Sequence, residues 1–146
     1  MNFRIRPLTC LDYKEIQEIF TSLFTESEDK KFTTAWRNRT KGLSMGIYKN
    51  KDLVGFALVQ GSQLAYIGIH PSYQAFGLGS KLLRNVLEQA FEKGQNIYLT
   101  PVNNQRVIQW YMKHGFALSH SGPSNIPDVP YLIYNAHKYA TRSKTI

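Results

Sequence analysis

A buried strand that leads through two glycines into a helix is the feature that most constrains the fold of this chain. Residues 64–69 form an almost wholly apolar run of the kind found in central strands. From residue 78 to residue 93, apolar side chains recur at helical spacing on one face. Gly77 and Gly79 stand at the junction between the two elements. A strand-to-helix unit of this type favours an α/β architecture.

Weaker patterns on either side complete the expected order of elements. Alternating or apolar runs predict strands over residues 2–7, 43–49, 53–60, 96–102, 116–121 and 131–137. Helical spacing predicts helices over residues 10–24 and 104–113, with a short helix over 32–40 after a polar loop over 25–31. The order β-α-(α)-β-β-β-α-β-α-β-β predicts an α/β (α+β) domain with a mixed, partly antiparallel sheet.

Length and composition favour one globular domain. At 146 residues the chain has the usual size of a single domain, so we expect one domain over residues 1–146 with a frayed tail over 138–146. The 42% of hydrophobic residues argue against disorder. Neither a membrane-spanning run nor a signal-peptide pattern is present, so we expect a cytoplasmic protein without a membrane partner. One cysteine and four scattered histidines predict no metal site.

The net charge points to an anionic partner. Eighteen Lys and Arg residues against ten Asp and Glu residues give a net charge of +8. This charge suits nucleic acid, a membrane surface or a phosphorylated ligand. Nucleic-acid binding ranks low, because the sequence has no helix-turn-helix, RNA-recognition signature or basic–aromatic cluster. Six of the ten acidic residues fall between residues 12 and 29, which leaves the rest of the chain strongly basic.

The glycine-containing loop has the form of a phosphate-binding site. Several backbone N–H groups at a helix start lack an intrahelical partner, and the helix dipole is positive there. Such a loop can cradle a phosphate, and a tight turn without a ligand is an equally open interpretation. Dinucleotide binding fits less well, because the third glycine of that fingerprint is missing and no acidic residue lies near position 100.

Two motifs in this part of the chain resemble those of the GNAT N-acetyltransferase superfamily. Gln74, Gly77 and Gly79 match the Q/R-x-x-G-x-G/A pattern that this family carries at its strand-to-helix junction. The family's later pattern, an Asn, a Tyr seven residues on and then Gly-Phe, is present as Asn104, Tyr111 and Gly115-Phe116. The resemblance covers residues 53–116 well, and the segments before and after match in element order only.

The resemblance implies a mixed, mostly antiparallel central sheet flanked by helices, and a binding site for acetyl-CoA. The strands at residues 64–69 and 96–102 would be parallel and would splay apart to admit the pantetheine arm, while amides of the glycine loop would hold the pyrophosphate. The implied cofactor-binding residues are Ile67, Gly68, Ile69, Gln74, Ala75, Phe76, Gly77, Leu78, Gly79, Ser80 and Asn104. Pro101 supports the splay, because proline cannot donate to a strand ladder, although an edge strand explains it equally well.

The same resemblance gives Tyr111 the role of general acid, which protonates the thiolate of departing CoA. A phenol with a pKa near ~10 suits this task. The alternative for this residue is an aromatic ring packed beside Trp110. Asn104 would cap its helix, bond the cofactor, or do both.

The general base is the point where the sequence departs from the family. Many members place a Glu at the start of the fourth strand or within the fifth, and these positions here are Gln63 and Leu99. Neither side chain can take a proton. His70 and His120 remain as candidates, and a water chain or an already neutral amine could serve instead.

The expected function is transfer of an acetyl group from acetyl-CoA to a primary amine of a small molecule, peptide or protein. A sensor that binds acyl-CoA, or a transferase for a longer acyl chain, stays open because the usual base is missing. In this family the loop after the first helix helps to wall the acceptor site, and here it carries Glu26, Glu28 and Asp29. A cationic amine would be drawn to these acids, and a solvated loop is the alternative. A monomer or a homodimer is expected.

Overall fold

The computed structural model describes residues 2–101, 104–119 and 131–136, and the chain divides into two compact units, Met1–Val86 and Leu87–Ile146. Seven strands, paired mostly antiparallel, are accompanied by four α-helices among the described residues. This arrangement confirms the predicted mixed α/β fold class. The prediction of one domain over the whole chain stays a prediction, and the expected tail at 138–146 lies outside the described residues.

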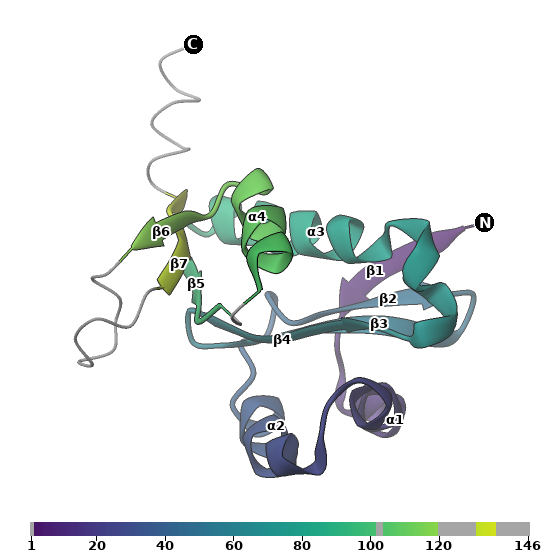
Figure 1. The fold of residues 1–146 in the computed structure, drawn as a ribbon. Coiled ribbons are helices and arrows are strands. Elements are labelled where there is room, and N and C mark those ends of the chain that lie inside the picture. The colour runs from purple at the N-terminus through teal and green to yellow at the C-terminus, as the bar shows by residue number, and fades with distance from the viewer. Residues whose placement is uncertain (1, 102–103, 120–130, 137–146) are drawn as a thin grey trace. The chain divides into compact units, whose positions relative to one another are not determined.

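The first unit is a four-stranded antiparallel sheet with helices on both faces. Its strand order is β1-β2-β3-β4, with bounds Phe3–Pro7, Met45–Lys49, Asp52–Gln60 and Gln63–Ile69. Two helices, α1 (Tyr13–Leu23) and α2 (Asp29–Arg37), lie on one face, and α3 (Leu78–Glu92) begins on the other (Figure 1). Three 3-10 turns lie between these elements: η1 (Cys10–Asp12), η2 (Glu26–Glu28) and η3 (Pro71–Phe76).

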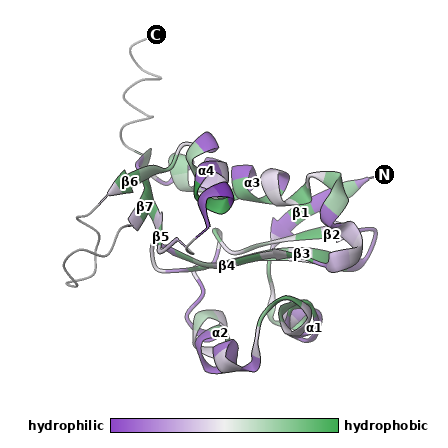
Figure 2. Cartoon of the chain, in the orientation of Figure 1, coloured by the Kyte–Doolittle hydropathy of each residue, from purple (hydrophilic) through white to green (hydrophobic). Residues whose placement is uncertain are grey.

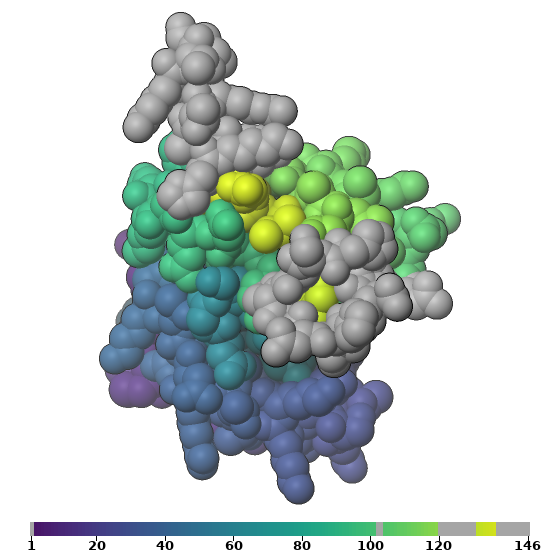
Figure 3. Space-filling view, turned by 90° about the vertical axis from the view of Figure 1, so that its left-hand side faces the viewer, coloured from purple at the N-terminus to yellow at the C-terminus, as the bar shows by residue number. Residues whose placement is uncertain are grey.

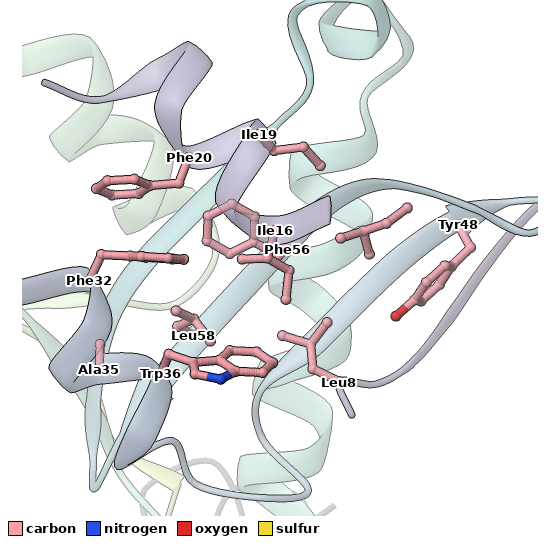
Figure 4. Packing of buried hydrophobic residues seen from close by; sticks show 11 residues of the cluster. Leu8, Ile16, Ile19, Phe20, Phe32, Ala35, Trp36, Tyr48, Phe56 and Leu58 are labelled. Atoms are coloured by element: carbon pink, nitrogen blue, oxygen red, sulfur yellow. The ribbon is translucent and has the colours of Figure 1, made fainter. Parts of the chain in front are cut away.

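The core of this unit forms where α1 and α2 meet the sheet. Both helices are amphipathic, as the alternation of hydrophobic and hydrophilic colours in Figure 2 shows. Their buried faces close over Phe56 and Leu58 of β3 (Figure 4). The rings of Phe20 in α1 and Phe32 in α2 stack with centroids 4.2 Å apart, which holds the two helices together above the sheet.

The second unit contains the rest of α3, one further helix and three short strands. These elements are β5 (Ile97–Leu99), α4 (Gln105–Lys113), β6 (Ala117–Ser119) and β7 (Tyr131–Tyr134). The strands pair antiparallel in the order β5-β7-β6. Among the described residues, no helix is long and apolar enough to cross a membrane.

Several element boundaries differ from those expected, and two of the differences bear on the candidate site. The prediction of a polar loop over 25–31 is wrong for most of that range, because η2 and the first turn of α2 occupy residues 26–31. The strand predicted over 96–102 is ordered only as Ile97–Leu99, and Pro101 follows outside it. Proline has no N–H to donate to a ladder, which agrees with a strand that ends early. Residue 102 itself lies outside the described residues.

Candidate active site

The end of β4 is fixed to its neighbour strand and to the loop that follows. The backbone N–H of His70 donates to the carbonyl oxygen of Val54 in β3, at 2.7 Å. The imidazole Nδ1 of His70 then accepts a hydrogen bond from the backbone N–H of Ser72, at 3.1 Å, and so caps η3. This bond occupies the Nδ1 lone pair, so the structure gives His70 a structural task at the nitrogen that a base would need.

The first residue of the glycine motif acts through its side chain. Gln74 donates a hydrogen bond from Nε2 to the carbonyl oxygen of Ile69, at 3.1 Å. The amide thus ties η3 back to the last residue of β4. A short side chain at this position could not span that gap, which explains why a long one capable of hydrogen bonding precedes the two glycines.

Gly77 needs to be glycine for its backbone conformation. Its φ of 70° and ψ of 20° lie in the left-handed region, which side chains rarely adopt. A Cβ built on Gly77 would meet no heavy atom within 4 Å, so open space adjoins this backbone. The combination allows a ligand to approach the main chain closely at the point where α3 begins.

The first turns of α3 offer donors and positive charge. Leu78 is 1% exposed and anchors the helix start in the core. The N–H groups of a first turn have no partner four residues back, and the dipole adds partial positive charge. Lys81 and Arg84 are exposed one and two turns further on. This end of α3 therefore suits an anion.

In β4, the backbone N–H and C=O groups of two residues point away from β3. Ile69 lies opposite Gly55 and Ile67 opposite Ala57 in the antiparallel register. Hydrogen-bonded and non-hydrogen-bonded pairs alternate in such a ladder, and His70 is hydrogen-bonded to β3. The N–H and C=O groups of Ile67 and Ile69 consequently point to the opposite edge of β4, as the proposed contact with pantetheine requires.

Gly68 has a packing role that the sequence did not reveal. A Cβ at this buried position would lie 2.6 Å from Cδ1 of Leu23. The missing side chain lets α1 approach β4. Whether Gly68 also contacts a ligand stays a prediction.

A β-bulge and a cavity mark the other end of β4. Leu58 pairs with Tyr66 but Val59 pairs with Leu64, so Ala65 is an extra residue in β4. Beside the bulge lies a cavity of about 440 Å³, lined by α2, η2 and the start of β4. The hydroxyl of Tyr66 donates to Oε2 of Glu28 at its wall, at 2.9 Å. Gln63 also lines this cavity.

In the second unit, Tyr111 is buried among aromatic rings. It is 9% exposed, and its ring lies 4.9 Å from that of Trp110 and 5.4 Å from that of Phe116. Burial disfavours the phenolate and raises the pKa of Tyr111 to about 12. The group is therefore protonated at neutral pH and able to donate. The contact with Trp110 fits the packing alternative as well, so the catalytic role stays a prediction.

Asn104 caps α4. Its Oδ1 accepts hydrogen bonds from the backbone N–H groups of Arg106 and Val107, at 3.0 and 3.4 Å. This confirms the capping role, and a contact with the cofactor stays a prediction. Leu99, the second position where an acid was sought, is 4% exposed. His120 lies outside the described residues, and within those residues no group of His, Cys, Asp or Glu is arranged to hold a metal ion.

Sequence reasoning missed the pair of Tyr66 and Glu28. The two residues are 38 positions apart and belong to no motif, so no pattern connects them. The nearest signal was the acidic loop after the first helix. Of its three acids only Glu28 is partly buried, whereas Glu26 and Asp29 are exposed.

Comparison with known proteins places these features in a family. The model of the acetyltransferase (GNAT) family matches residues 13–116. A tRNA(Met) cytidine acetyltransferase of Saccharolobus solfataricus is 29% identical over 91 residues, which are 60% of this chain and 12% of that protein. The chain therefore spans a small part of the curated relative's length.

Solved structures share the fold over most of their length. The ribosomal-protein-S18-alanine N-acetyltransferase of Escherichia coli superposes with a TM-score of 0.70 at 22% identity, covering 90% of this chain and 91% of that one. Naa50 of Arabidopsis thaliana, in complex with the bisubstrate analogue CoA-Ac-MVNAL, gives 0.66 at 22% identity, covering 91% and 97%. Because the family model spans both motifs and the fold agrees, the chain belongs to the GNAT acetyltransferase family.

Proposed function

We propose that this chain transfers an acetyl group from acetyl-CoA to a primary amine. The observation that carries the proposal is the left-handed Gly77, with open space beside it, at the start of a helix whose first turns are basic. A pyrophosphate is the part of acetyl-CoA that such a site would hold. The chain's membership of an acetyltransferase family agrees with this ligand.

The outward backbone groups of Ile67 and Ile69 would continue the site along β4. The Ile69 carbonyl oxygen already accepts from Gln74, but a carbonyl has a second lone pair. Pantetheine carries amides that can form hydrogen bonds with the backbone groups of a strand. The pyrophosphate would thus lie at the start of α3 and the thioester toward the start of β4.

The transfer itself needs one acid and a neutral amine. The amine nitrogen forms a bond to the carbonyl carbon of the thioester, and the carbon–sulfur bond breaks. Tyr111 gives its proton to the departing thiolate and is reprotonated from water. The amine loses a proton to water, because Gln63 and Leu99 cannot accept one.

The named relatives act on a tRNA cytidine and on an alanine of a ribosomal protein, so the family's acceptors differ widely. We propose that the reaction takes place in the cytoplasm. An acyl-CoA sensor of the same fold is the second candidate, and the absence of an acid at Gln63 and Leu99 is what favours it.

A matched pair of variants tests the proposed pyrophosphate site. Asn and Asp both tolerate the left-handed region and have the same shape, so Gly77→Asn and Gly77→Asp differ only in charge. Acetyl-CoA should raise the Tm of the wild type by binding the folded state. The rise should survive partly in the Asn variant and disappear in the Asp variant. Equal rises in both variants would remove the site from this loop.

An activity measurement distinguishes the proposed transferase from an acyl-CoA sensor. Release of free thiol from acetyl-CoA, measured with a panel of primary amines, should depend on the amine. A rise in Tm with no thiol release from any amine would favour the sensor instead.

A further inference from the structure

The cavity beside the β-bulge is a feature of the first unit for which no motif gave an explanation. It measures about 440 Å³, and its wall includes Glu28, Lys30, Lys31 and Tyr66. Small-molecule sites are hollows of a few hundred Å³ with a few placed polar groups. Residues of α2 lie at the surface, as the dark blue atoms in Figure 3 show, so the cavity lies next to solvent.

The carboxylate in the cavity wall is held in place. Tyr66 donates to Oε2 of Glu28, and the Tyr66 ring is packed edge-on against Phe20 and Phe24, with centroids 5.4 and 5.3 Å apart. Burial and the bond to Glu28 raise the pKa of Tyr66, so the phenol stays a donor across the physiological range. The bond uses one carboxylate oxygen of Glu28, Oε2, and restrains the carboxylate in the cavity wall.

Two lysines line the same cavity as this carboxylate. Lys30 and Lys31 are exposed and belong to the first turn of α2. The positive end of the helix dipole favours an anion at the same place. A plain cationic amine would be attracted by one charge and repelled by two. A molecule with an amine and an anionic group satisfies all three.

The position of the cavity along β4 connects it with the proposed reaction. If the pyrophosphate lies at the start of α3 and pantetheine follows Ile69 and then Ile67, the chain direction leads next to Tyr66 and Ala65. Each strand residue advances about 3.3 Å, so the thioester end would arrive beside the cavity. This step rests on the proposed function.

We propose that the cavity binds the acceptor, and that this acceptor is a small amine that also carries a carboxylate or a phosphate. Glu28 receives the amine, Tyr66 positions Glu28, and Lys30 and Lys31 receive the anionic group. The sequence led us to expect that a cationic amine is drawn to Glu26, Glu28 and Asp29 together. Of these three acids only Glu28 lines the cavity, so the proposal assigns the contact with the amine to Glu28 alone.

Matched probes test the substrate class. L-leucine carries both groups, L-leucinamide lacks the carboxylate charge, and 3-methylbutylamine lacks the carboxyl group altogether. O-phosphoethanolamine carries a phosphate in place of the carboxylate, so it shows which of the two anionic groups the cavity prefers. With thiol release as the assay, kcat/KM should be at least roughly tenfold higher for leucine or phosphoethanolamine than for the two probes without an anion, as expected for one charge-assisted contact. Equal values for all four probes would overturn the proposal.

Variants with matched controls test the residues. Glu28→Gln should raise KM for every amine, whereas Glu26→Gln, an exposed neighbour, should not. The double variant Lys30→Met, Lys31→Met should lower kcat/KM for leucine to the value for leucinamide, and it should leave kcat/KM for leucinamide unchanged. Lys14→Met is the control for losing an exposed lysine. All variants should keep the acetyl-CoA-induced rise in Tm. Unchanged selectivity in the double lysine variant would contradict the proposal.

Direct binding keeps this inference separate from the activity. Calorimetric titration of L-leucine and of O-phosphoethanolamine needs no turnover, and binding of at least one should be lost in the double lysine variant. If the wild type acetylates none of the probes, the proposed function is in doubt while the titration still decides the inference. If the wild type binds neither probe and acetylates amines without an anion, the inference is wrong and the proposed function stands.

Discussion

Tyr111 is a buried residue whose phenolic proton the proposed reaction would use. Its ring is enclosed by Trp110 and Phe116, and burial raises the pKa to about 12. A phenol in that range is fully protonated at neutral pH, so the proposed acid has its proton in place before the reaction. A free thiol titrates near ~8.5, so the departing thiolate is a weaker base than the Tyr111 phenolate, and burial keeps the proton on Tyr111 without itself favouring its transfer.

Replacing Tyr111 with Phe should slow turnover without loosening the cofactor. The ring and its packing remain and only the proton is lost, so kcat should fall by roughly 10²–10⁴-fold, the range of general-acid effects. The acetyl-CoA-induced rise in Tm should be retained. Tyr13→Phe removes a hydroxyl from a partly buried ring in the first unit and serves as the control. If kcat is the same in both variants, Tyr111 is a packing residue.

The raised pKa of Tyr111 also makes a prediction about alkaline stability. A pKa that is higher in the folded state, about 12 against 10.0 for the free group, stabilises the protonated native form below pH 10, and this contribution is lost as the pH rises toward 12. Chemical unfolding between pH 9 and about 11.5 should therefore show a steeper loss for the wild type than for Tyr111→Phe, by a difference of the order of 2 kcal/mol. Parallel curves would mean that the phenol is not desolvated.

Residues with a local signal could be predicted from the sequence, and residues with a distant partner could not. The spacing of Gln74, Gly77 and Gly79 identified the loop before α3. Asn104 is a residue type that favours the N-cap position, and the structure confirms that it caps α4. The side-chain bond of Gln74 to Ile69 and the pairing of Glu28 with Tyr66 depend on how the chain folds back on itself. No periodicity records such contacts.

At the scale of the elements, the order of strands and helices was predictable because each has its own apolar period. The start of α2 was not. Residues 26–31 are polar and mostly exposed, so the apolar spacing begins only at Phe32, one turn into the helix. The early end of β5 could be anticipated from Pro101, whose backbone cannot donate to a ladder. The β-bulge at Ala65 left no signal, since an apolar run looks the same with or without an extra residue.

The contact of α1 with β4 predicts a specific double-mutant effect. Gly68→Ala should destabilise the fold by only about 0.5–1 kcal/mol, because its Cβ would overlap Cδ1 of Leu23, the end of a flexible, partly exposed side chain that can turn aside. Shortening that side chain makes room, so Leu23→Ala and Gly68→Ala together should cost less than the sum of the two by more than about 0.5 kcal/mol. Denaturant unfolding measures all four proteins.

Gly61 supplies the control for this cycle. It has a positive φ of 64° and no heavy atom within 4 Å of a built Cβ, so Gly61→Ala introduces backbone strain without a clash. Its effect should be additive with that of Leu23→Ala. Additivity at Gly68 as well would show that α1 and β4 are not in close contact there.

The charge of the protein is unevenly divided along the chain. Ten acids oppose eighteen bases, and six of the acids lie within residues 12–29. The first turns of α3 therefore belong to a strongly basic remainder, in which Lys81 and Arg84 are exposed. A phosphate-bearing ligand would be attracted by this field over distances that salt can screen.

The KM for acetyl-CoA should consequently rise with ionic strength, whereas kcat at saturating acetyl-CoA should change little. Raising the salt from about 0.05 to 0.5 M shortens the Debye length from roughly 14 to 4 Å, which removes long-range attraction and leaves direct contacts. The double variant Lys81→Met, Arg84→Met should start from a higher KM and show a flatter salt dependence, because the charges nearest the loop are gone. Lys14→Met, which lies in the acidic segment, should keep the slope of the wild type. A KM that is independent of salt in the wild type would mean that the net charge of +8 plays no part in drawing acetyl-CoA to the chain.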